Sequence, residues 1–355
     1  MKPTSDPVKT ARERQVTMED VAREARVSRA LVSLVMRESP NVSEKRRTRV
    51  LEAAERLGYR PNLMARRLAS RRTRTIGVLL NDLRNPFFPE IMDGIFEAAD
   101  NLNYQLLIGT GRRQTAGERR AIDAFLEHRA DGIVLVSPRL PEAEILSIGR
   151  TTHTVIVGRP VRASYIDSVT NDDVAGAKLA VRHLAELGHS RIAHIDGGRG
   201  AGATARRAGY LREMAHRGLK PQVVSGEFTE VAGVRAAESL LTPGELPTAV
   251  FAANDLVAAG ALDRFEDAGL RIPGDISIIG YDNTFLAALH HMSLTTINQP
   301  RPEIGRLALN TLVERIDGVR STAVHLKLEP SLVIRATTGP PPPGARVKAL
   351  RTHHS

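Results

Sequence analysis

The sequence of 355 residues contains no cysteine. This absence excludes disulfides, thiolate metal sites, iron–sulfur clusters and cysteine nucleophiles, and it agrees with a reducing compartment. No apolar run approaches the roughly 20 residues that a membrane-spanning helix requires. Residues 1–20 are polar and have no apolar segment that resembles a secretory signal. We therefore expect a cytoplasmic protein with no membrane partner.

The net charge of +10 is concentrated in one part of the chain. Residues 1–75 carry 19 Lys+Arg and 9 Asp+Glu, whereas the other 280 residues carry 31 of each sign and sum to zero. This distribution indicates a small N-terminal domain that meets a polyanion, with nucleic acid as the leading candidate. Charge alone leaves a solvated basic surface or tail as the alternative. The length and the 42% hydrophobic content predict two or three globular domains.

Three short helices are predicted in residues 16–60, after an arm (1–15) that lacks apolar periodicity and that we expect to be disordered. Thr17 can cap the first helix, and Ser28 can cap the second, which runs over 29–36. Ser43 opens the third helix, and Gly58 ends it. A three-residue turn joins the first two helices, so the pattern predicts a helix-turn-helix bundle. Residues 61–75 have helical composition but are too short to form a stable helix alone.

After residue 75, short apolar strands such as IGVLL, DGIVLV and ISIIGYD alternate with amphipathic helices over more than 200 residues. This alternation predicts an α/β fold with parallel sheets that are covered by helices on both faces. The tail, 339–355, contains four consecutive prolines and several basic residues. We expect it to be extended and mobile.

The chain resembles the LacI/GalR family of bacterial transcription regulators over residues 16 to about 338. The resemblance is carried by several motifs in the right order. They are the headpiece VTMEDVAREARVSRALVSLVMRESPNVSEKRRTRVLEAAERLGYRPNLMARRLAS, the opening of the core DLRNPFFPEIMDGIFEAAD, and the segments HLAELGHSRIAHIDG, RRAGY, AVFAANDLVAAGAL, IIGYDN and LTTINQP.

The resemblance implies a helix-turn-helix headpiece (16–60), a hinge helix and linker (61–75), and a core (76–338) like that of the periplasmic sugar-binding proteins. Such a core has two doubly wound parallel-sheet lobes that are joined by three crossovers. The first lobe would take about 76–165 and 296–323, and the second about 166–293 and 326–338. The core would bind an effector and form a homodimer.

The second helix of a helix-turn-helix presents its N-terminal side chains to base edges in the major groove. Arg29 can bond guanine through two hydrogen bonds, whereas Ala30 and Leu34 can offer only apolar contact. Core packing is the alternative role for Leu34. The full set of expected DNA contacts in the headpiece is Thr17, Ser28, Arg29, Ala30, Ser33 and Leu34.

The hinge is the second expected DNA contact. In the family, paired hinge helices enter the minor groove and insert a leucine at the central base step, and the matching residue here is Leu68, with Asn62, Ala65 and Arg66 beside it. A basic linker between domains is the alternative. Two departures from the family pattern stand out in the headpiece. Arg26 replaces a turn glycine, which predicts a strained positive φ, and Leu34 and Arg37 replace the usual Arg and Asn, which predicts a different operator preference.

The effector site is expected between the lobes, at the carboxyl ends of the strands. A polyhydroxylated ligand needs paired donors and acceptors for its hydroxyls and a flat apolar surface for its C–H face. Phe87 and Phe88 have core packing as an alternative role. The positions that match the family's site are Asn85, Phe87, Phe88, Arg206, Phe251, Asn254 and Asp282.

Three other classes of protein agree less well with the sequence. Gly198, Gly200 and Ala203 satisfy the dinucleotide-binding pattern G-x-G-x-x-A, with Glu227 after the next strand. A secreted sugar-binding protein would share the lobes, but it would have a signal peptide and no basic headpiece. Catalytic motifs are absent, and the adjacent pairs His290–His291 and His353–His354 are poorly spaced for a metal.

The sequence therefore predicts a regulator of transcription, most readily a repressor, and not an enzyme. Its expected partners are double-stranded operator DNA of palindromic sequence, a second copy of the chain, and a small effector such as a carbohydrate or related polyol. No cofactor and no metal are expected.

Overall fold

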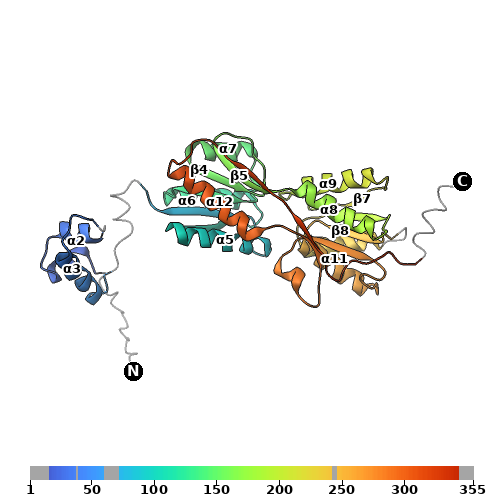
Figure 1. Ribbon diagram of the computed structural model, residues 1–355, viewed down its shortest axis with the longest axis horizontal. Helices are drawn as coiled ribbons and strands as arrows, with labels where there is room; N and C mark the ends of the chain where they lie inside the picture. Colours follow the sequence, from blue (N-terminus) through green and yellow to red (C-terminus); the bar gives the residue numbers. More distant parts are fainter. Residues whose placement is uncertain (1–15, 37–38, 60–71, 242–245, 344–355) are drawn as a thin grey trace, which may run out of the picture. The chain divides into compact units, whose positions relative to one another are not determined.

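The computed structural model describes residues 16–36, 39–59, 72–241 and 246–343. The chain divides into two compact units, Met1–Thr73 and Arg74–Ser355, and each is considered by itself. Figure 1 shows both units. In the described residues, no helix combines the length and the apolar character that a membrane span requires.

In its described residues the first unit has the helices α1 (Met18–Glu24), α2 (Arg29–Met36) and α3 (Glu44–Arg56). Thr17 caps α1 as predicted, because its hydroxyl accepts from the Asp20 N–H at 3.3 Å while the Asp20 carboxylate accepts from the Thr17 N–H at 2.9 Å. The Ser28 hydroxyl accepts from the Leu31 N–H at 3.2 Å at the start of α2. The three helices enclose a small core built on Val21, Val32, Val35, Val50 and Ala53.

The turn between α1 and α2 has the backbone conformation that its sequence predicts. Arg26, where the family has a turn glycine, adopts φ +50°. A side chain in this left-handed region costs on the order of 1 kcal/mol. Gly58 follows α3 with φ +63°, which ends the helix in the expected way. Ser43 lies at the start of α3, but its side chain makes no capping hydrogen bond.

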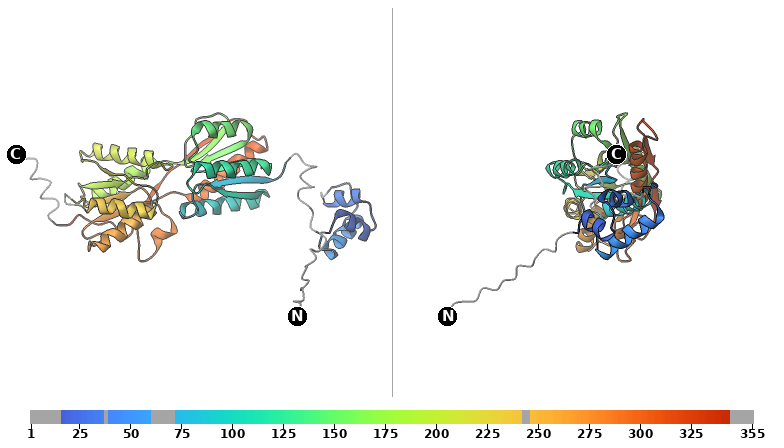
Figure 2. Two further views of the ribbon diagram at one scale, coloured as in Figure 1. Left: turned by 180° about the vertical axis from the view of Figure 1, so that it is seen from behind. Right: turned by 90° about the vertical axis from the view of Figure 1, so that its left-hand side faces the viewer.

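The second unit is a core of two lobes, each with a six-stranded sheet (Figures 1 and 2). The first sheet is wholly parallel, and the second is parallel except for one antiparallel pair, β10 with β12. In spatial order the first sheet is β11 (His325–Leu328), β5 (Ile166–Asn171), β4 (His153–Val157), β3 (Gly132–Val136), β1 (Thr75–Leu80) and β2 (Gln105–Thr110). The second is β12 (Ser331–Val333), β10 (Thr295–Asn298), β9 (Ser277–Asp282), β8 (Ala249–Ala252), β6 (Ile192–Ile195) and β7 (Gln222–Val224).

Helices cover both faces of each sheet because successive strand residues point to opposite sides. In β1, Val78 packs toward α5 (Phe87–Leu102) and α12 (Arg301–Ile316), whereas Leu79 packs toward α6 (Thr115–Glu127) and α7 (Glu142–Thr151). The second sheet has α8 (Asp173–Glu186) and α9 (Ala203–His216) on one face, and α10 (Glu230–Leu240) and α11 (Asp255–Asp267) on the other. Both faces are buried, which explains the nearly continuous apolar strands of the sequence.

The chain crosses between the lobes three times, but each crossing lies a few residues beyond the expected boundary. The crossings follow β5, β10 and β11, since β5 and β11 pair within the first sheet and β10 pairs with β9 in the second. The expected boundaries had assigned 166–171 and 326–328 to the second lobe and 296–298 to the first. Hydrogen-bonded strand pairing, which local periodicity does not reveal, decides these assignments.

The first residues of the segment expected to be a mobile tail, 339–343, lie within the described residues. Gly339, its first residue, is held by the core, because its carbonyl accepts from His189 Nε2 at 2.8 Å and its N–H donates to Ser277 Oγ at 3.0 Å. Residues 344–355 lie outside the described residues, as does the arm 1–15.

Candidate functional site

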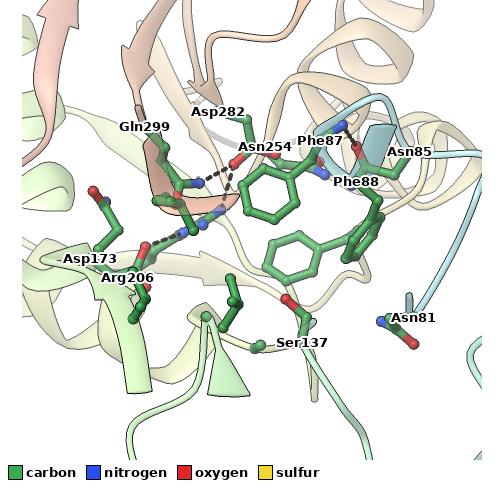
Figure 3. A pocket seen from close by; sticks show the side chains of 17 residues that line it. Asn81, Asn85, Phe87, Phe88, Ser137, Asp173, Arg206, Asn254, Asp282 and Gln299 are labelled. Atoms are coloured by element: carbon green, nitrogen blue, oxygen red, sulfur yellow. Dashed lines mark hydrogen bonds and ion pairs between the residues drawn. The ribbon is translucent and has the colours of Figure 1, made fainter. Parts of the chain in front are cut away.

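A cavity lies between the two lobes of the core. Its walls come mostly from the carboxyl ends of strands and the loops that follow them, as expected for doubly wound sheets. Figure 3 shows that side chains of both lobes face one another across it. The lining residues are Asn81, Asn85, Phe87, Phe88, Ser137, Val157, Gly158, Val169, Asn171, Asp173, Ala201, Arg206, Phe228, Asn254, Asp282, Gln299 and Ile304.

Six of the seven positions expected at the effector site line this one cavity, and Phe251 does not. Phe251 has no exposed surface, and its ring stacks on that of His194 at 4.6 Å. The assignment of Phe251 to the site is therefore wrong. The alternation along β8 turns its side chain onto the face of the sheet that α8 and α9 cover.

Arg206 is the central cation of the cavity. Its Nε donates to Asp173 Oδ1 at 3.0 Å, and its Nη1 donates to the Ala253 carbonyl at 2.6 Å and to Asp282 Oδ1 at 3.4 Å. The guanidinium carbon lies 3.7 Å from the centre of the Tyr281 ring. Burial opposes the charge, but Asp173 and Asp282 outweigh it and raise the pKa of Arg206 above its ordinary value. The guanidinium is thus held charged in one orientation.

Asp282 ends β9 and is nearly inaccessible to solvent. Its Oδ1 accepts from Gln299 Nε2 at 2.6 Å. Burial raises the pKa of Asp282 to about 7, although the charge of Arg206 acts in the opposite direction. Arg206 thus pairs with two carboxylates, because its Nε lies 3.0 Å from Asp173 Oδ1 and its Nη1 lies 3.4 Å from Asp282 Oδ1.

Four asparagines give the cavity a balance of donors and acceptors. Asn85 and Asn254 each use the side-chain oxygen inside the protein, accepting from the backbone N–H of Phe87 at 3.0 Å and of Val257 at 2.9 Å. Their amide N–H groups are therefore the parts that can donate to a ligand. Asn81 and Asn171 each have a buried side-chain oxygen with no hydrogen-bond partner. Such an oxygen is costly unless a ligand or water donates to it.

Aromatic rings form the apolar part of the wall. Phe87 and Phe88 meet edge to face, with ring centres 5.3 Å apart, and both are largely buried. They belong to the core of the first lobe and also line the cavity, so the two roles that the sequence left open coexist. The ring centre of Phe228, from the second lobe, lies 5.3 Å from the guanidinium carbon of Arg206.

Sequence reasoning missed several polar residues of the cavity. They share a signal that could have found them, because each lies at or just after the carboxyl end of a strand of the core. They are Asn81 after β1, Ser137 after β3, Asn171 at the end of β5, Asp173 at the start of α8 two residues later, and Gln299 after β10.

The glycine-rich segment before α9 has a structural explanation. A Cβ at Gly197 or Gly200 would lie 2.4 or 2.3 Å from the Phe228 ring, so these glycines make room for the protein's own side chain. Glu227, the acidic residue of the dinucleotide pattern, forms an ion pair with Arg113 of the first lobe. These contacts favour an effector loop over a cofactor site. His290 and His291 are exposed, and no cluster suited to a metal ion occurs among the described residues.

Five of the six expected DNA contacts in the headpiece are exposed, and Ser33 is half-buried. Arg29 and Ala30 are exposed at the start of α2, and Leu34 is 37% exposed, which argues against a pure core role. The hinge residues Asn62, Ala65, Arg66 and Leu68 lie outside the described residues, as does Arg37.

The two units thus define a class of regulator that joins a helix-turn-helix DNA-binding domain to a ligand-binding core. Two family profiles match the chain: bacterial regulatory proteins, lacI family, over residues 17–62, and periplasmic binding protein-like domain over residues 181–338. Catabolite control protein A of Priestia megaterium is 36% identical over 319 residues, or 88% of this chain and 96% of that protein. The transcriptional repressor CytR of Escherichia coli K12 is 37% identical over 331 residues, or 92% and 97%.

Solved structures of LacI-family regulators are also similar to this chain. The lac repressor dimer bound to operator and the anti-inducer ONPF matches with a TM-score of 0.82 and 28% identity, over 92% of this chain and all of that one. A LacI transcriptional regulator from a Rhodococcus species matches with a TM-score of 0.71 and 36% identity, over 76% and 99%. The chain belongs to the LacI family of transcription regulators, with a DNA-binding and a ligand-binding domain.

Proposed function

We propose that this protein is a repressor that binds a pseudo-palindromic operator as a homodimer, and that a sugar or related polyol in the cavity switches its affinity for DNA. The observation that carries the proposal is the polar lining of the cavity. Arg206, Asn85 and Asn254 supply donors, and Asp282 and the unpartnered oxygens of Asn81 and Asn171 supply acceptors. A hydroxyl group both donates and accepts, so a compound with several hydroxyls satisfies both sets.

The aromatic wall supports the same class of ligand. The rings of Phe87, Phe88 and Phe228 offer a surface for the C–H face of a sugar ring. Two structurally similar regulators have carbohydrate ligands, one bound to cellobiose and one to ribose, at TM-scores of 0.69 and 0.68. We infer binding and release, not catalysis, as the work of the cavity.

The DNA side of the proposal rests on α2 and on the hinge. Arg29, Ala30, Ser33 and Leu34 would meet base edges in the major groove, and Thr17 and Ser28 would contact the backbone beside them. Asn62, Ala65, Arg66 and Leu68 would enter the minor groove, with Leu68 as the wedge at the central step. Two-fold symmetry of a dimer would impose two-fold symmetry on the operator.

The ligand class can be tested by thermal stabilisation of the purified protein with sugars, polyols and nucleosides, D-ribose and cellobiose included. We expect at least one hydroxyl-rich compound to raise the melting temperature and to change operator affinity in the same concentration range. Stabilisation by NAD(P) and by no polyol would contradict the proposal and favour a dinucleotide site.

The site itself can be tested with Arg206→Ala and Asp282→Ala. A ligand shifts a conformational equilibrium only through its different affinity for the two states, so loss of these groups should remove the response of operator binding to the active compound. If the unliganded form binds DNA, both variants should still hold the operator. If the ligand is a corepressor, both should lose operator binding under all conditions. A normal ligand response in both variants would show that the site lies elsewhere.

A further inference from the structure

An ion pair in the first lobe, between the buried Arg301 and the partly exposed Glu90, binds the backbone of the second lobe next to the cavity. Arg301, at the start of α12, donates from Nε to Glu90 Oε2 on α5 at 2.7 Å. The same guanidinium donates to the Asn283 carbonyl at 2.6 Å, and Glu90 Oε1 accepts from the Phe285 N–H at 3.0 Å. Two side chains of the first lobe thus hold the backbone of residues 283–285 in the second. We refer to Glu90 and Arg301 as the clamp.

The clamped segment follows Asp282 directly and has an unusual backbone. Asp282 and Asn283 have φ values of +110° and +55°, which non-glycine residues rarely adopt. Such a conformation persists only where surrounding contacts hold it. Arg335 supplies one more contact, from Nη2 to Asn283 Oδ1 at 2.7 Å. The clamp therefore helps to set the direction in which the Asp282 carboxylate points into the cavity.

A second connection runs from the clamp to the same carboxylate. Arg301 Nη1 donates to the Gln299 carbonyl at 3.1 Å, and the Gln299 side chain donates to Asp282 Oδ1 at 2.6 Å. Figure 3 shows Gln299 and Arg206 on the same side of Asp282. A ligand that changes the contacts of Asp282 thus acts on groups that the clamp holds through both the backbone and Gln299.

The helices that carry the clamp cannot slide easily against each other. A Cβ at Gly94 of α5 would lie 1.8 Å from the Pro302 carbonyl oxygen, and one at Gly305 of α12 would lie 2.0 Å from that of Ile91. The two backbones are therefore in direct contact, on the same helices as Glu90 and Arg301. A displacement of residues 283–285 relative to the clamp becomes a movement of one lobe against the other.

We propose that Glu90 and Arg301 are positioning residues that couple Asp282 to the relative orientation of the two lobes. The inference rests on the proposed function, because it describes how a ligand in the cavity changes the orientation of the first lobe, which follows the headpiece in the chain. It goes further in assigning the coupling to one ion pair outside the cavity lining.

The inference can be tested without any ligand. Since the chain has no cysteine, Arg120→Cys on α6 and Arg212→Cys on α9 add one exposed labelling site to each lobe. Spin-label distance measurements on this doubly substituted full-length protein report the distribution of lobe orientations. We expect Glu90→Gln and Arg301→Lys, each added to that background, to shift or broaden the distribution.

The matched control is a second ion pair on α12. Glu303 and Arg306 lie 3.4 Å apart and are exposed, so Glu303→Gln and Arg306→Lys should leave the distance distribution unchanged. Glu90→Gln preserves the shape of a partly exposed side chain, which keeps the test usable if Arg301→Lys does not fold. An unchanged distribution in a folded Glu90→Gln variant would overturn the inference.

A functional measurement separates this inference from the proposed function. The coupling is measured as the ratio of two operator affinities, one with and one without a ligand. The ligand is the compound that stabilises the protein most in the panel with D-ribose and cellobiose. We expect Glu90→Gln to reduce that ratio by roughly tenfold, while affinity for the compound itself changes far less. A wild-type ratio in the variant would overturn the inference. A ratio of one in the unsubstituted protein would overturn the proposed function, and the distance measurement would still decide the role of the clamp.

Discussion

His194 shows at the scale of one residue how burial sets a protonation state. It lies in β6 with no exposed surface, between the rings of Tyr210 and Phe251. Its Nδ1 donates to the Phe251 carbonyl at 2.9 Å, and its Nε2 is buried with no partner. Burial lowers the pKa of His194 to about 4, although the hydrogen bond to Phe251 opposes this effect. The ring is neutral in the folded protein at physiological pH.

This shift predicts a loss of stability in acid. Below pH 6.5 the unfolded chain protonates the residue and the folded chain does not, so the free energy of unfolding falls as the pH drops toward 4. Between pH 7.5 and pH 5 the wild type should lose about 2 kcal/mol more than His194→Asn, whose side chain does not titrate. Urea unfolding of the core at both pH values measures the difference, with His216→Asn on the exposed end of α9 as control. Equal pH dependence in wild type and His194→Asn would contradict the assignment.

At the scale of an element, α2 has one face that packs in the core of the headpiece and another that is exposed. Val32 and Val35 are buried against α1 and α3, whereas Arg29, Ala30 and Leu34 face outward. Arg29 lies 3.8 Å from Glu19, but both side chains are 68% exposed. An exposed ion pair of this kind contributes little to the free energy of folding, so Arg29 can leave Glu19 and turn toward DNA at a small cost in free energy.

The expected role of Arg29 can be measured by Arg29→Ala. If Arg29 bonds a guanine in each half-site, the substitution should weaken operator binding by about 1–3 kcal/mol per contact and relax the preference at that base pair. Arg23→Ala is the matched control, since it removes the same charge from an exposed position on α1. Binding titrations against operator and against a variant with the base pair exchanged give the specificity. A loss of the same size on both DNA sequences would assign Arg29 to the phosphate backbone instead.

At the scale of the whole molecule, charge and fold divide the chain at nearly the same place. The first compact unit ends at Thr73, and the basic excess is confined to residues 1–75. The remaining residues are neutral in sum and form both lobes and the cavity. The division separates a unit that attracts a polyanion from one that binds a small molecule.

Removal of residues 1–73 should therefore abolish operator binding and preserve ligand binding. With the full-length protein, the logarithm of the binding constant should fall linearly with the logarithm of salt concentration, with a slope of about −0.9 per phosphate neutralised. Gel shifts at several salt concentrations and thermal shifts of the truncated core with the same compound panel measure both effects. A truncated core that still shifted operator DNA would contradict the assignment of DNA binding to the headpiece.

The sequence by itself determined the features that depend on local spacing. Caps at Thr17 and Ser28 and the alternation of strands and helices follow from neighbouring residues, whereas the positive φ of Arg26 was expected from the turn glycine that the family has at this position. Six of the seven positions that the family resemblance implied for the site line the cavity. Only the tertiary structure decided the lobe boundaries, the exclusion of Phe251 from the cavity, and the meeting of Glu90 with Arg301, which are 211 residues apart. Strand partners and long-range ion pairs depend on how distant segments pack, and no local pattern encodes that packing.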